Sequence, residues 1–145
     1  MYRFKLEVLL NHRRHQEEVC QKELARTRRK LADEQEKLDQ KKKEKRANVQ
    51  KLRFKQKENT TVSDIILHVN YIQQLTQDIA MQTGCVQEAA NKVHQNRDAL
   101  IVIMKKRKTL EKLDDKERQA YEQKLIQDEL KSVDEFASIR HARKI

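Results

Sequence analysis

Leucine recurs at seven-residue intervals along the first third of this chain. The series comprises Leu10, Leu24, Leu31, Leu38 and Leu52, with Glu17 and Lys45 at the two remaining positions. A seven-residue apolar period keeps one stripe of an α-helix against a partner helix, which is typical of a coiled coil rather than a globular core. Because a thin helical rod has no enclosed pocket for small-molecule chemistry, we expect this protein to work by contacting other proteins.

Composition also favours long helices. The chain has 145 residues, no Pro, a single Gly at position 84, and 39% charged residues. High charge with few aromatic residues would also suit disorder, but a disordered segment shows no sustained heptad phase. The sequence therefore predicts an all-α protein, a single coiled-coil domain over residues 1–145.

One cluster of small polar residues, Asn59–Asp64, interrupts the helical pattern. Thr61 with Asp64, or Ser63 alone, is suited to cap a second helix. We therefore predict helices at about 2–57 and 64–143, with a turn at about 58–63. Together they would form an antiparallel coiled-coil hairpin.

A second apolar stripe is expected along the second helix. Its predicted members are Ile65, Val69, Ile72, Thr76, Ile79, Thr83, Val86, Ala90, Val93, Arg97, Leu100 and Met104. Pairing residues whose numbers sum to 117 matches this stripe to the leucines and centres the hairpin on the turn. In that register Leu24 meets Val93 and Leu38 meets Ile79. Residues beyond about 116 then form a C-terminal helical overhang, which is amphipathic through Ile126, Leu130, Val133 and Ala137.

Catalysis has little support in this sequence. A single glycine excludes a Walker-type phosphate loop, and no nucleophile–base pair stands out. His12, His15 and Cys20 do not have a spacing that converges on one metal ion, so exposed helix residues are the favoured interpretation. Cys20 and Cys85 are expected to be free thiols. We expect no enzyme activity, no catalytic residue, no metal and no cofactor.

Two other features point to partners. Between Lys41 and Lys57, nine basic residues face one acid, Glu44. A solvated helix face and an acidic protein surface are the main alternatives there, and nucleic acid is a weaker one. Ile101, Val102 and Ile103 lie off the predicted stripe, so they form a candidate partner patch, with local repacking as the alternative. The apolar run around them is too short to span a bilayer.

Three further segments are distinctive: the opening Tyr2–Arg13, the segment Tyr71-Ile72-Gln73-Gln74-Leu75, and the ending Leu130–Arg140 with its Asp134-Glu135-Phe136 sequence. They resemble the flagellar FliJ family of coiled-coil export proteins. The resemblance implies a stalk-like adaptor whose termini enter the hexameric export ATPase, stimulate it and link it to the export-gate membrane protein. The family is also associated with handling export chaperones.

The resemblance also implies which residues make these contacts. Phe4, Leu6, Leu10, Phe136 and Arg140 are the candidates for ATPase binding, and Leu38, Tyr71 and Leu75 are the candidates for gate binding. The resemblance implies a location peripheral to the inner membrane at the flagellar base. A cytoplasmic location is also expected because no segment of the sequence reads as a secretion signal or membrane span. The alternatives are a basic coiled coil that binds nucleic acid and a self-associating scaffold.

Overall fold

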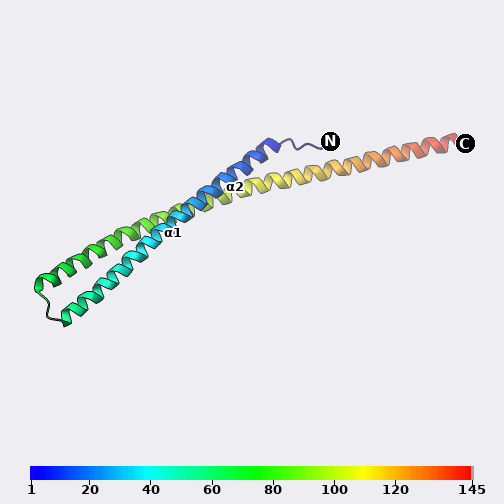
Figure 1. The fold of residues 1–145 in the computed structure, drawn as a ribbon. Coiled ribbons are helices and arrows are strands. Elements are labelled where there is room, and N and C mark those ends of the chain that lie inside the picture. Colours follow the sequence, from blue (N-terminus) through cyan, green and yellow to red (C-terminus); the bar gives the residue numbers. More distant parts are fainter. Residues whose placement is uncertain (145) are drawn as a thin grey trace. The chain divides into compact units, whose positions relative to one another are not determined.

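Two long helices account for almost the whole of the described chain. The computed structural model describes residues 1–144 and shows α1 (Glu7–Lys57) and α2 (Val62–Lys144), with no strand in that range (Figure 1). Ile145, which the predicted domain included, lies outside the described residues. Gly84 does not interrupt α2, and a Cβ at this position would meet nothing within 4 Å beyond its chain neighbours and the backbone of its own helix. The predicted fold class, two long packed helices, is confirmed.

The turn between the helices is built by two threonines. The Thr61 hydroxyl oxygen accepts a hydrogen bond from the Asp64 backbone N–H at 3.4 Å, which is the geometry of a helix N-cap. The Thr60 hydroxyl donates to the Lys55 carbonyl at 3.0 Å and so satisfies one of the free carbonyls at the end of α1. The predicted cap at Thr61 with Asp64 is confirmed.

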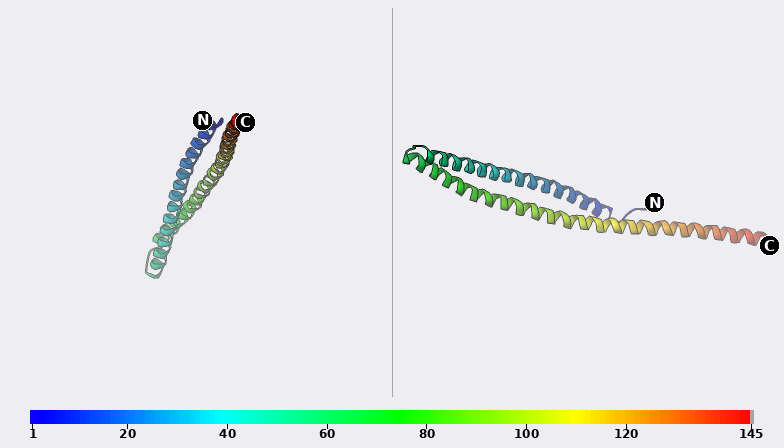
Figure 2. Two further views of the ribbon diagram at one scale, coloured as in Figure 1. Left: turned by 90° about the vertical axis from the view of Figure 1, so that its right-hand side faces the viewer. Right: turned by 90° about the horizontal axis from the view of Figure 1, so that it is seen from below.

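The chain divides into two compact units. The central unit is Val19–Leu100, and the terminal unit is Met1–Glu18 together with Ile101–Ile145. In the central unit α1 and α2 run antiparallel from the turn, as the contacts of Lys55 with His68 and of Thr27 with Asn96 show (Figure 2). In the terminal unit they are also antiparallel, with Arg14 beside Glu111.

The stripe of α1 lies where the leucine repeat predicts. Leu10, Leu24 and Leu38 are buried, and Leu31 and Leu52 are partly buried. The predicted polar members Glu17 and Lys45 belong to the same stripe, Glu17 buried and Lys45 partly buried.

The stripe of α2 differs from the prediction at every second position. Its buried residues are Leu75, Gln82 and Ala89, each one residue before a predicted member. Thr76 and Thr83, which were expected on the stripe, are exposed. The predicted seven-residue period is correct, but within each period the observed stripe takes its step of three residues before its step of four, the reverse of the prediction. Every second position of the predicted stripe was often polar, so apolar residues did not indicate the order of the two steps.

This shift also changes the pairing of the helices. In an antiparallel pair, moving three residues towards the C-terminus along the stripe of one helix must correspond to moving three residues towards the N-terminus along the stripe of the other. The observed stripes satisfy that rule when Leu38 lies beside Gln82 and Leu31 beside Ala89. The hydrogen bond from Gln82 to the Glu34 carbonyl lies within one residue of the predicted register, whereas the one from Asn96 to Thr27 lies closer to the shifted register. The observed stripes thus favour a register about three residues away from the one that paired Leu24 with Val93.

The first six residues are not helical, although a helix from about Tyr2 was expected. Instead, the Tyr2 hydroxyl donates a hydrogen bond to the Asp114 carboxylate at 2.6 Å, and the Tyr2 ring lies 5.7 Å from that of Tyr121. Phe4 is buried in the same terminal unit. The extended segment covers α2 as far as Tyr121, so the unpaired part of α2 begins at Glu122 rather than near residue 116.

Candidate docking surfaces

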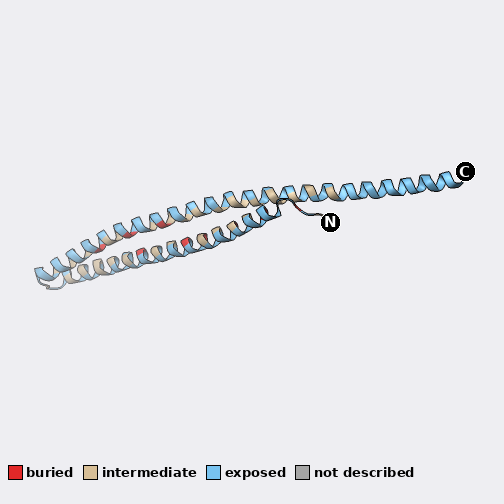
Figure 3. Cartoon of the chain, turned by 90° about the horizontal axis from the view of Figure 1, so that it is seen from above, coloured by how far each residue is buried: buried red, intermediate tan, exposed pale blue. Residues whose placement is uncertain are grey.

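The end of α2 presents the longest uncovered surface of the terminal unit. Every residue from Glu122 to Lys144, a segment we call the overhang, is exposed (Figure 3). Its large apolar residues are Leu125, Ile126, Leu130, Val133, Phe136 and Ile139. From Ile126 onwards they recur at steps of three and four residues, which places them on one side of the helix.

The apolar side of the overhang is not a continuation of the stripe used within the chain. Continuing the spacing of the α2 stripe beyond Tyr121 leads to Lys124, Asp128, Lys131 and Glu135, all of them charged. The apolar residues lie one or two positions further along, a rotation of roughly 100–200° around the helix. The overhang therefore offers its apolar side to a partner other than α1.

The residues expected to bind an ATPase fall into two groups. Phe136 and Arg140 lie on the overhang, where the Arg140 guanidinium is 5.8 Å from the centre of the Phe136 ring. Phe136 is 64% exposed, and Leu6 is also exposed. Phe4 and Leu10 are buried against the rest of the terminal unit. Three of the five candidates are thus open to a partner, and the other two hold the amino-terminal segment in place.

The candidates for gate binding are divided in the same way. Leu38 and Leu75 are buried in the stripes of the central unit, 4% and 5% exposed, although the predicted stripe of α2 contained Thr76 and not Leu75. Tyr71 is exposed, and its hydroxyl donates a hydrogen bond to the Glu44 carboxylate of α1. This hydrogen bond, reinforced by desolvation, raises the pKa of Tyr71. Of the three, Tyr71 alone presents a side chain to a partner.

The candidate partner patch at residues 101–103 is smaller than expected. Ile101 and Val102 are exposed, whereas Ile103 is partly buried because it belongs to the observed stripe of α2. The patch therefore has two accessible side chains, and the stripe accounts for the third.

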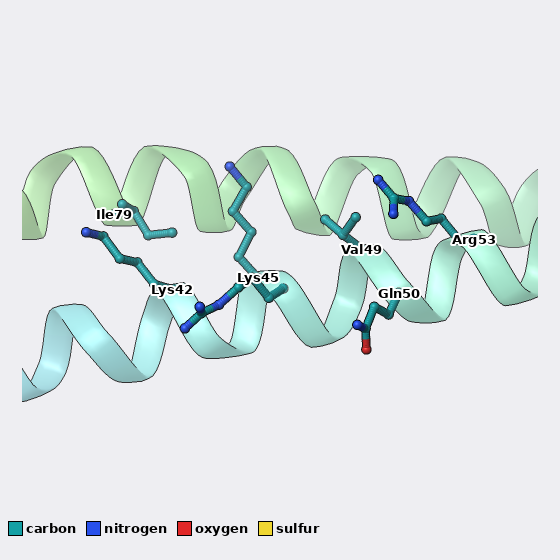
Figure 4. Close-up of a pocket in the computed structure, with 7 residues that line it drawn as sticks. Lys42, Lys45, Val49, Gln50, Arg53 and Ile79 are labelled. Carbon is teal, nitrogen blue, oxygen red and sulfur yellow. The ribbon is translucent and has the colours of Figure 1, made fainter.

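Beside the hairpin turn, a basic groove runs along α1 in the central unit. Its volume is about 580 Å³, and it is lined by Lys42, Lys45, Arg46, Val49, Gln50, Arg53 and Ile79 (Figure 4). No carboxylate lines it, because Glu44 is turned towards Tyr71. The groove is the structural counterpart of the predicted basic segment, and it suits an anionic ligand.

A set of exposed apolar residues around the turn was missed in the sequence. Phe54 lies near the end of α1 among basic residues, and Val62, Ile66 and Leu67 lie in the first two turns of α2. The available signal was Phe54, a large aromatic residue between Arg53 and Lys55, at a position that the leucine repeat does not use.

Among residues 1–144 no group of three or more potential ligands is placed to hold a metal ion. Cys20 and Cys85 are free. No helix within these residues combines the length and the apolar character required to cross a membrane.

The model of the family described as flagellar FliJ protein matches residues 2–145, essentially the whole chain. No curated protein and no solved structure matches the chain.

Proposed function

Because the chain belongs to the flagellar FliJ protein family, and hence to the components of the flagellar protein export apparatus, we propose that it is a non-enzymatic stalk of that apparatus. In this proposal it binds the hexameric export ATPase, stimulates ATP hydrolysis, and connects the ATPase to the export-gate membrane protein. It would act in the cytoplasm, at the inner membrane beneath the flagellum. Handling of export chaperones, which is associated with the family, belongs to the same proposal.

The observation that carries this proposal is the overhang. Its apolar side chains are uncovered, and they face away from the stripe that pairs α2 with α1. From Glu122 to Lys144 it has five acidic and five basic residues, so its formal charge is balanced. A helix of this kind suits a binding site that is lined by apolar side chains, such as the interior of a protein ring.

In this proposal, the exposed candidate residues would contact the ATPase directly. Phe136 and Arg140 extend from the overhang, and Leu6 extends from the amino-terminal segment beside α2. Phe4 and Leu10 would contribute indirectly by packing that segment in the terminal unit. At the gate, Tyr71 would make the contact, while Leu38 and Leu75 hold the two helices together beneath it.

The experiment compares the two sides of the overhang. We expect Ile126→Ser with Leu130→Ser and Val133→Ser to weaken ATPase stimulation by at least about tenfold, since each side chain loses its burial in the complex. The control is Lys124→Ser with Asp128→Ser and Lys131→Ser, which lowers helix propensity similarly on the opposite side. Stimulation is measured as ATP hydrolysis by the hexameric ATPase. Equal loss in both variants, or full stimulation by the first, would contradict the proposed contact.

A second candidate function rests on the basic groove. A row of cations without a lining carboxylate, as at Lys42, Arg46 and Arg53, also suits the phosphate backbone of nucleic acid. Retention on DNA that weakens steeply with salt, together with no effect on the ATPase, would favour that function. A self-associating scaffold would instead show sedimentation that depends on protein concentration.

A further inference from the structure

The hairpin turn of the central unit carries large apolar side chains that nothing in that unit covers. Phe54 is 70% exposed, Val62 71%, Ile66 53% and Leu67 66%. We call these four residues the tip surface. They lie outside the stripe that packs the helices at this end, which uses Leu52, Lys55, Ile65 and His68. The hairpin therefore does not need them for its own packing.

The same end of the hairpin is rich in cations. Lys51, Arg53 and Lys57 are exposed around Phe54, and Lys55 lies 2.8 Å from the His68 ring nitrogen. The acids nearby are Glu58 in the turn and Asp64 in the first turn of α2. At that position Asp64 faces the positive end of the helix dipole, which compensates part of its charge. Cations continue along α1 through the basic groove.

The apolar side chains of the tip surface and the cations around it lie at similar distances from the turn, measured along the helix axes. From Val62 to Leu67 the helix rises by roughly 7.5 Å. A peripheral helix buries its apolar side chains ~5–10 Å into the boundary between headgroups and acyl chains. Lysine and arginine at that height extend their charged ends to lipid phosphates while their stems cover apolar surface. The tip surface thus has the depth and the charge that an anionic bilayer surface requires.

We propose that the tip surface binds directly to an anionic phospholipid surface, with Phe54, Val62, Ile66 and Leu67 entering the interface and the surrounding cations contacting phosphate. Charge alone would equally suit nucleic acid or an acidic protein. Four uncovered apolar side chains in the midst of the cations favour lipid, because neither of the other surfaces needs a ring of apolar groups around the turn. This contact is independent of ATPase binding by the overhang.

Vesicle binding with matched variants tests the proposal. The full chain should sediment with phosphatidylglycerol vesicles and not with vesicles of phosphatidylcholine alone. Phe54→Gln with Ile66→Gln and Leu67→Gln should weaken this binding at least about tenfold. Leu125→Gln with Leu130→Gln and Phe136→Gln, which removes as many exposed apolar residues from the overhang, should leave it unchanged. Circular dichroism of each variant checks that its helices persist.

The contribution of charge is measured separately. Lys51→Gln, Arg53→Gln and Lys57→Gln should each weaken binding to phosphatidylglycerol by about fivefold. Lys55 is left in place because it contacts His68. If the charge variants lost binding while the apolar variant bound as well as the unaltered chain, the contact would be electrostatic only. That result would overturn the proposal and favour nucleic acid or an acidic protein.

A fluorescence measurement does not depend on the multiple variants. The chain has no Trp, so Phe54→Trp introduces a single reporter at the tip surface, and Phe136→Trp introduces a matched one on the overhang. Phosphatidylglycerol vesicles should shift the emission of Phe54→Trp to shorter wavelength and leave that of Phe136→Trp unchanged. No shift at position 54, or an equal shift at both positions, would overturn the insertion of the tip surface.

Discussion

Helix α2 is one continuous helix with two different surfaces. Between Ile65 and Tyr121, a buried or partly buried side chain recurs at least every four residues, whereas from Glu122 to Lys144 every side chain is exposed. Both stretches carry apolar residues at helical spacing. In the first stretch the apolar residues of the stripe face α1 or the amino-terminal segment, and in the overhang the apolar residues lie on the other side of the helix. The comparison separates residues that fold the protein from residues left for a partner.

The largest expected difference is between a leucine in each stretch. Leu75→Ala removes a buried side chain and should lower the free energy of unfolding by about 2–4 kcal/mol. Leu130→Ala, on the exposed overhang, should change it by less than about 0.5 kcal/mol. Urea unfolding followed by circular dichroism measures both. Similar losses in the two variants would mean that the overhang is packed or that Leu75 is not.

Part of this division could be predicted from the sequence. The leucine repeat of α1 predicted its stripe, because a leucine every seven residues leaves one choice of face. Thr61 and Asp64 predicted the cap, because small polar residues occur together only there. Both signals are local, and each depends on a few residues of distinctive type.

The stripe of α2 could not be predicted in the same way. Thr76 and Leu75, or Thr83 and Gln82, are neighbouring residues, and either of each pair continues a seven-residue period. The choice depends on what α1 places opposite, such as the Glu34 carboxylate that accepts a hydrogen bond from Gln82. The extended amino-terminal segment was missed for a similar reason, since its partner Asp114 is 112 residues away in the sequence.

Charge does not distinguish the two stretches, as a comparison of Arg107 in the packed stretch with Arg140 on the overhang shows. The Arg107 guanidinium donates to both Glu111 carboxylate oxygens, at 3.1 and 2.9 Å, and forms an ion pair with Glu17 of α1. Hydrogen bonds to Glu111 and then to Glu17 raise its pKa. The side chains of Arg107 and Glu17 are 20% and 12% exposed. A charge can therefore belong to the packed stretch when it has partners there.

Substituting these arginines should have an intermediate effect. Arg107→Gln leaves the largely buried Glu17 without its cation and should lower the free energy of unfolding by about 1–3 kcal/mol. Arg140→Gln, on the exposed overhang, should lower it by less than about 0.5 kcal/mol. Glu17→Leu with Arg107→Leu should recover most of the loss, because an apolar pair needs no compensating charge. A loss in the double variant equal to that of Arg107→Gln would show that Glu17 was not the group left unpaired.

The smallest expected effect lies at the boundary between the two stretches, where Tyr2 contacts Asp114 and Tyr121. Desolvation, and then the hydrogen bond to Asp114, raise the pKa of Tyr2 to about 12, above its ordinary value of 10.0. A raised pKa in the folded state means that the contact contributes fully below about pH 10 and is lost as pH rises towards 12. Absorbance titration in a Tyr71→Phe, Tyr121→Phe background isolates the ionisation of Tyr2.

Adding Asp114→Asn should lower the Tyr2 pKa towards 10, and hydrogen exchange at residues 114–121 should speed up between pH 10 and 12. An unchanged pKa in the Asp114→Asn variant would mean that Tyr2 does not fix where the overhang begins.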